Sequence, residues 1–157
     1  MSASAELTGS CSDRDLLVAG ATAYWAEGSK NKEWRIADQV TFINSDVDMI
    51  SLFLAFLRHL GVREDQLRFR VSIHQSGDEA AARARWAEVV GHPAGTFQRS
   101  TLKRHNPKTA RKNVGAGYHG CLVINVLRSK HLYRQIEGIW RAISSPSSSL
   151  GPPSRIV

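Results

Sequence analysis

Residues 67–74, with the sequence LRFRVSIH, alternate apolar and polar side chains without a break. One side of an extended chain here is wholly apolar: Leu67, Phe69, Val71 and Ile73. The other side is polar and includes two arginines: Arg68, Arg70, Ser72 and His74. Because successive side chains of a strand point to opposite faces, this pattern predicts a sheet that is buried on one face only. The rest of the chain must cover that face and leave the arginines open.

Four segments with helical patterns can cover the apolar face of this sheet. They lie at roughly 13–27, 46–60, 79–90 and 130–143. The expected N-caps are Ser12, Ser45, Asp78 and Ser129. Asp15 and Asp48 stand three residues after the first two caps, which is the spacing of a capping box. Gly20 lies in mid-helix, where glycine costs roughly 1 kcal/mol relative to alanine, so we expect a packing reason for it.

Further strands are expected on both sides of residues 67–74. Two short ones, at 34–37 and 39–44, would form a tight hairpin, and two more lie at 96–103 and 120–128. The element order α, β, β, α, β, α, β, β, α predicts an α+β fold, with helices on one face of a mainly antiparallel sheet. The length fits one domain, at 12–143. Residues 1–11 are predicted to be disordered and the Ser/Pro-rich residues 144–157 to be a flexible tail.

Charge is the first indication of function. The chain has a net charge of +7, and its acidic residues are concentrated before residue 89. Nine basic residues then follow before Glu137, with no acid among them: Arg99, Lys103, Arg104, Lys108, Arg111, Lys112, Arg128, Lys130 and Arg134. Such a stretch is typical of proteins that bind a phosphate backbone. A solvated face, or one that binds RNA or an acidic protein, is the alternative.

No apolar run reaches the ~18 residues of a membrane span, and the N-terminus lacks a signal-peptide pattern. We therefore expect a cytoplasmic protein without a membrane partner, associated with the nucleoid when DNA is bound. The two cysteines, Cys11 and Cys121, are far apart in the sequence and form no CxxC pair. This spacing argues against a disulfide framework and against a cysteine-built zinc site.

The stretch AGATAYWAEGSK, residues 19–30, resembles the signature helix of the LAGLIDADG homing-endonuclease family. Its Ala26-Glu27-Gly28 stands where that family has A-D-G, although Thr22 occupies the place of a packing glycine. The segments FINSD and MISLFLAFLRHLGV, within 42–62, are similar to the family's strand-to-helix passage. LRFRVSIH, FQRSTLK and CLVINV then follow the family's order, so the resemblance covers about 13–143. It is closest to divergent single-motif versions of the family found in actinobacterial proteins.

The resemblance implies an αββαβαββα variant whose sheet forms a concave saddle over double-stranded DNA. A chain with one motif would form a homodimer along a seam of small residues: Ala19, Ala23 and Ala26. Glu27 would bind Mg²⁺ or Mn²⁺ and act as the catalytic acid of phosphodiester hydrolysis. Lys103, at the end of its strand, is our candidate for stabilising the transition state, although no motif assigns it.

The residues expected to contact DNA are basic or polar and lie in the strands, the hairpin and the long loop. They are Lys30, Lys32, Arg35, Arg68, Arg70, Arg99, Arg104, His105, Asn106, Lys108, Arg111, Lys112 and Asn113. Arginine and lysine would meet phosphates, while Arg104, Asn106 or Asn113 could read base edges.

Three alternatives stay open from the sequence. The chain could keep the DNA-binding scaffold without cutting and act as a regulator, because one acid per chain is a small metal-ligand set. His105-Asn106 and His119 suggest an HNH-type nuclease, but their glycine-rich loop does not offer the compact hairpin and helix that this motif needs. An RNA or acidic-protein binding module is the third.

Overall fold

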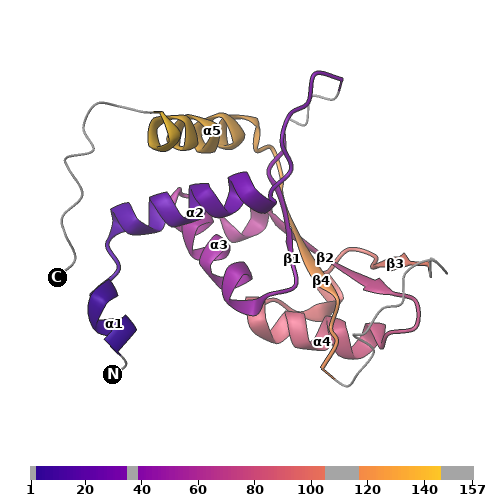
Figure 1. Cartoon of the computed structure of the whole chain (residues 1–157). Coiled ribbons are helices and arrows are strands. Elements are labelled where there is room, and N and C mark those ends of the chain that lie inside the picture. Colours follow the sequence, from indigo (N-terminus) through magenta and orange to yellow (C-terminus); the bar gives the residue numbers. More distant parts are fainter. Residues whose placement is uncertain (1–2, 35–38, 105–116, 146–157) are drawn as a thin grey trace.

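A four-stranded sheet in the order β1-β4-β2-β3 lies at the centre of the molecule (Figure 1). The computed structural model describes residues 3–34, 39–104 and 117–145. The strands are β1 (Thr41–Asn44), β2 (Leu67–His74), β3 (Thr101–Lys103) and β4 (Cys121–Val126). β4 is antiparallel to both β1 and β2, whereas β3 is parallel to β2. The sheet is therefore mixed but mainly antiparallel, and the predicted α+β class is confirmed.

Helices cover one face of this sheet (Figure 1). They are α2 (Asp13–Glu27), α3 (Val47–His59), α4 (Glu79–Val90) and α5 (Lys130–Ser144). α2, α3 and α4 contact the strands, and α5 packs on α2. The four apolar residues of 67–74 all lie in the buried core, together with Leu122, Ile124 and Val126 of β4. The orientation predicted for residues 67–74 is confirmed.

Two of the four predicted N-caps, those of α2 and α4, are confirmed. Ser12 Oγ accepts a hydrogen bond from the Asp15 amide, and the Asp15 carboxylate accepts one from the Ser12 amide, which confirms that capping box. Asp78 caps α4 through the Ala81 amide, as predicted. α3 begins one residue later than expected, because Asp46 rather than Ser45 accepts from the amides that follow it.

α2 is held between two other helices. A Cβ placed on Gly20 would lie 2.1 Å from Cγ of Phe56 in α3, so the helix backbone sits directly against that ring. On another side, Trp25 stacks on Trp140 of α5, with ring centroids 5.8 Å apart. The expected packing reason for Gly20 is therefore the close approach of α2 to α3.

Ser129 stands at the N-cap position of α5 but does not cap it. Its Oγ donates to the Val126 carbonyl at 2.6 Å and accepts from the Val40 amide at 2.8 Å. The hydroxyl thereby ties the end of β4 to the residue before β1. This corrects the predicted cap: the serine is buried and stabilises the sheet rather than the helix.

Two further segments differ from the sequence expectation. Ala3–Thr8 form a short helix, α1, whose residues are all exposed, where disorder was predicted. The strand expected at 96–103 is limited to β3, and a 3-10 turn, η2 (Ala94–Thr96), occupies its expected start. A second 3-10 turn, η1 (Glu64–Gln66), precedes β2. The first strand of the predicted hairpin lies mostly outside the described residues, as does the tail after residue 145.

None of the helices in the described ranges combines the length and the apolar character that crossing a membrane requires.

Candidate nucleic-acid interface

The face of the sheet turned away from the helices, the helix-free face, carries side chains from all four strands. Strand register places them in four rows: Thr41, Asn125 and Arg68; Ile43, Val123 and Arg70; Cys121, Ser72 and Thr101; then His74 and Lys103. Val123 and Ser72 are buried at the bottom of this face. The flanking side chains rise above them, half-buried or exposed. The predicted open side with its two arginines is therefore present.

This face is positively charged, and no row contains an aspartate or glutamate. Arg68 Nη1 donates to the backbone carbonyls of Asp65 and Leu67, at 2.9 and 2.8 Å, so its charge is not neutralised by a carboxylate. Arg70 has a buried Nε with no hydrogen-bond acceptor among the described residues. Buried polar atoms are normally hydrogen-bonded, so the described residues do not satisfy all the donors of the Arg70 guanidinium.

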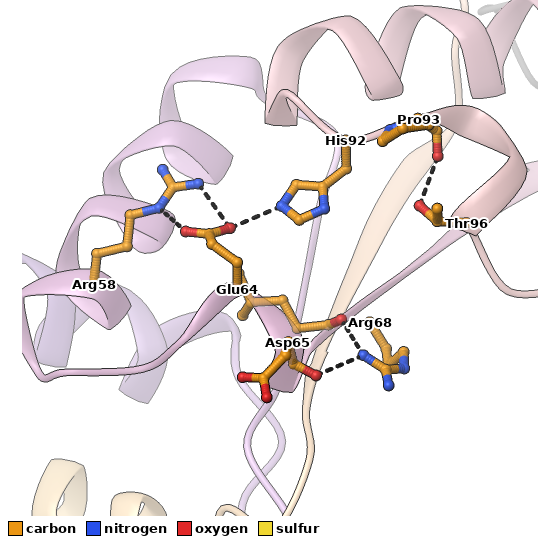
Figure 2. Close-up of polar contacts among 8 residues, drawn as sticks. Arg58, Glu64, Asp65, Arg68, His92, Pro93 and Thr96 are labelled. Atoms are coloured by element: carbon orange, nitrogen blue, oxygen red, sulfur yellow. Dashed lines mark hydrogen bonds and ion pairs between the residues drawn. The ribbon is translucent and has the colours of Figure 1, made fainter.

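The acids nearest the start of β2 are bound to other cations. Figure 2 shows Glu64 between Arg58, whose Nε lies 2.6 Å from one carboxylate oxygen, and His92, whose Nε2 lies 2.8 Å from the other. The hydrogen bond from Arg58, helped by the one from His92, lowers the pKa of Glu64 to about 2. Asp65 pairs with Arg63 at 2.9 Å. These pairs leave the arginines of β2 uncompensated.

The Glu64 contacts predict a loss of stability in acid. Because the folded pKa of about 2 lies below the ordinary 4.5, the contribution is complete above pH 4.5 and is lost as pH falls toward 2. Half of the side chain is exposed, so solvent screens it, and we expect about 1 kcal/mol at neutral pH. We would measure the free energy of unfolding in urea at several pH values. Below pH 4.5 it should fall less steeply for Glu64→Gln than for the native chain. Glu88→Gln, at an exposed acid, is the control, and an equally steep fall in all three proteins would contradict the prediction.

Glu27 lies at the opposite edge of the sheet from Lys103. Glu27 ends α2 and is exposed, and the next two residues run beside β1, where the Ser29 amide donates to the Thr41 carbonyl at 2.9 Å. Lys103 belongs to β3. With strands about 4.8 Å apart, three spacings separate these edges by about 14 Å. Within one chain the two candidate catalytic residues therefore lie at opposite edges of the sheet.

The donor set for a metal is also small. The ranges that the structure describes contain no group of three or more His, Cys, Asp or Glu side chains that could hold an ion. Mg²⁺ requires near-octahedral oxygen ligands, and Glu27 offers a single carboxylate. The residues of one chain thus do not by themselves fit the expected Mg²⁺ or Mn²⁺ site.

The predicted dimer seam is partly used inside the chain. Ala23 belongs to the core, at 7% exposed, whereas Ala19 is half-buried and Ala26 is exposed. A partner could therefore reach Ala26 and part of Ala19, but not Ala23 in this arrangement. Fewer of the three alanines are open to a partner than their spacing predicted.

Other predicted DNA contacts are distributed around the sheet. Lys30 Nζ donates to the Trp25 carbonyl at 2.5 Å, while Lys32, Arg99 and Arg104 are exposed. The remaining candidates lie outside the described residues: Arg35, His105, Asn106, Lys108, Arg111, Lys112 and Asn113.

Sequence reasoning missed two polar residues of the helix-free face. Thr41 Oγ1 donates to Asn125 Oδ1 at 2.9 Å, which holds the amide in the row that contains Arg68. The alternation in CLVINV was the signal that could have found Asn125, because it stands on the same face as Cys121 and Val123.

Comparisons of the chain with protein-family models, with curated proteins and with solved structures found no match. The evidence on function therefore comes from the helix-free face itself.

Proposed function

We propose that the protein binds double-stranded DNA through the helix-free face. The observation that carries this proposal is the set of cations on that face, Arg68, Arg70 and Lys103, with no carboxylate in any row. Phosphate oxygens supply the opposite charge. The resemblance of residues 13–143 to LAGLIDADG proteins points to the same ligand.

The spacing on β2 suits a phosphate backbone. Arg68 and Arg70 are two residues apart on one strand, so their Cα atoms are about 6.6 Å apart on the same face. Their guanidinium groups could therefore meet different phosphates of the same strand. Asn125, held by Thr41, keeps its amide donors for a base edge in the groove.

Duplex DNA fits this face better than RNA does. The major groove of B-DNA is wide enough for strands to enter, whereas that of an RNA helix is too deep and narrow. Proteins that bind single-stranded RNA stack bases on aromatic side chains. The eleven positions in the four rows include no Phe, Tyr or Trp, and His74 is their one ring.

The test is binding to a fluorescently labelled DNA duplex at several salt concentrations. We expect the double variant Arg68→Gln, Arg70→Gln to bind about tenfold more weakly and to lower the salt slope by about two, one for each phosphate contact. The control, Arg85→Gln with Arg134→Gln, removes the same charge from exposed helix positions and should bind like the native chain. Equal losses in the two double variants would show that net charge, and not this face, binds the DNA.

Binding without hydrolysis is the function we propose for a single chain, because Glu27 offers one carboxylate and the described residues contain no group of three or more possible metal ligands. Plasmid nicking with Mg²⁺ or Mn²⁺ that disappears in Glu27→Gln would add phosphodiester hydrolysis, with a second copy completing the site.

A further inference from the structure

Trp34 differs from the other three tryptophans of the chain. It is 80% exposed, whereas Trp86 is buried and donates its indole N–H to the His119 carbonyl at 2.9 Å. Trp25 and Trp140 are half-buried and stack on each other. Trp34 is therefore the tryptophan whose ring a ligand can reach.

The segment that carries Trp34 is fixed at its base. The Tyr24 hydroxyl donates to the Ser29 carbonyl at 2.5 Å, and the Asn31 amide donates to the Tyr133 hydroxyl at 2.9 Å. The Ser29 amide also donates to β1. From this base the described residues 29–34 run past α5 and beyond the end of the sheet, toward the top of Figure 1.

A positive charge accompanies the exposed ring. Lys32 Nζ lies 5.4 Å from the centre of the Trp34 ring, within the range of a cation–π contact. The segment joins β1 on the side of Thr41, which stands in the same row of the sheet as Arg68. The aromatic plane and its cation therefore belong to the segment that enters the sheet at the row containing Arg68.

We propose that Trp34 and Lys32 form a second DNA contact, in which the indole stacks on a base of the bound duplex and the ammonium meets the adjacent phosphate. This inference rests on the proposed DNA binding. Aromatic stacking on a base is tolerant of sequence, and insertion at a base step unstacks the duplex locally. The contact should favour flexible pyrimidine–purine steps.

Tryptophan emission gives a readout that affinity does not. In the native chain, we expect duplex DNA to quench the emission of Trp34 and to protect it from acrylamide. Trp34→Phe should abolish both changes while it binds nearly as well, and Trp34→Ala should bind about tenfold more weakly. Lys32→Ala should lower the salt slope by about one. Leu7→Ala, at another exposed apolar residue (87%), is the matched control and should bind unchanged.

Each result separates this inference from the function on which it rests. If the native chain does not bind DNA, both fall. If the Arg68→Gln, Arg70→Gln variant loses binding but DNA leaves Trp34 emission and acrylamide access unchanged, the indole is not on a base and this inference alone is overturned. Weaker binding by Trp34→Ala without an emission change overturns the stacking too. Protection of Trp34 that grows with protein concentration in the absence of DNA would assign it to contact between copies instead.

Discussion

Gly20→Ala is expected to destabilise the protein by roughly 3 kcal/mol, although alanine is the better helix former by roughly 1 kcal/mol. The added methyl would lie 2.1 Å from Cγ and 2.6 Å from Cβ of Phe56. Phe56 is completely buried, and its Cβ cannot move without shifting the backbone of α3. The two helices must therefore separate, which weakens the packing of α2 over the sheet. Urea unfolding measures the effect.

Gly138 provides the matched control, because it also lies inside a helix, α5, but nothing stands within 4 Å of the position that a Cβ would take there. Gly138→Ala should stabilise the protein by about 0.5–1 kcal/mol. The two substitutions are chemically identical, so opposite signs isolate the contact with Phe56. If Gly20→Ala is as stabilising as Gly138→Ala, the close approach of α2 to α3 is wrong.

Local features of the sequence predicted local structure well. The start of α2 and both ends of α4 follow from Ser12, Asp78 and Gly91, because caps act within one helical turn. The alternation of 67–74 gave the buried and open sides of β2, since a strand's faces are set by its own residues. For Gly20 the sequence predicted a packing reason but not the partner, because Phe56 lies in another helix.

The sequence patterns did not predict the contacts between residues far apart in the chain. Ser129 has the spacing of a cap, yet its hydroxyl bonds to Val126 and Val40 across the sheet. Glu27 and Lys103 were expected to act together, but the strand order places them at opposite edges. Strand order depends on which strands pair, and the pattern within each strand does not determine that.

Arg83 explains why the predicted strand at 96–103 is short, and it yields the second large effect. Its Nη2 donates to the Ala94 carbonyl at 2.8 Å and its Nη1 to the Gln98 carbonyl at 3.0 Å, with longer bonds to Phe97 and Ser100. The guanidinium also lies over the Phe97 ring, 5.8 Å from its centre. One side chain of α4 thus holds the irregular segment that leads into β3.

We expect Arg83→Ala to destabilise the protein by about 2–3 kcal/mol, because several carbonyls lose a charged donor at once. β3 has three residues and pairs only with β2 among the described strands, so it should lose much of its protection from hydrogen exchange. Urea unfolding gives the first quantity and amide exchange at 101–103 gives the second.

Arg85→Ala is the control, since Arg85 lies on the same helix but is exposed and contacts only Glu88, at 3.4 Å. It should change the free energy of unfolding by less than about 0.5 kcal/mol. Arg83→Lys keeps the charge but not the two-pronged geometry, so it should recover only part of the loss. Full recovery by lysine would mean that charge alone holds the segment. Lys103 reaches the helix-free face through β3. On the proposed function, Arg83→Ala should therefore also weaken DNA binding, because β3 folds poorly and not because one positive charge is lost.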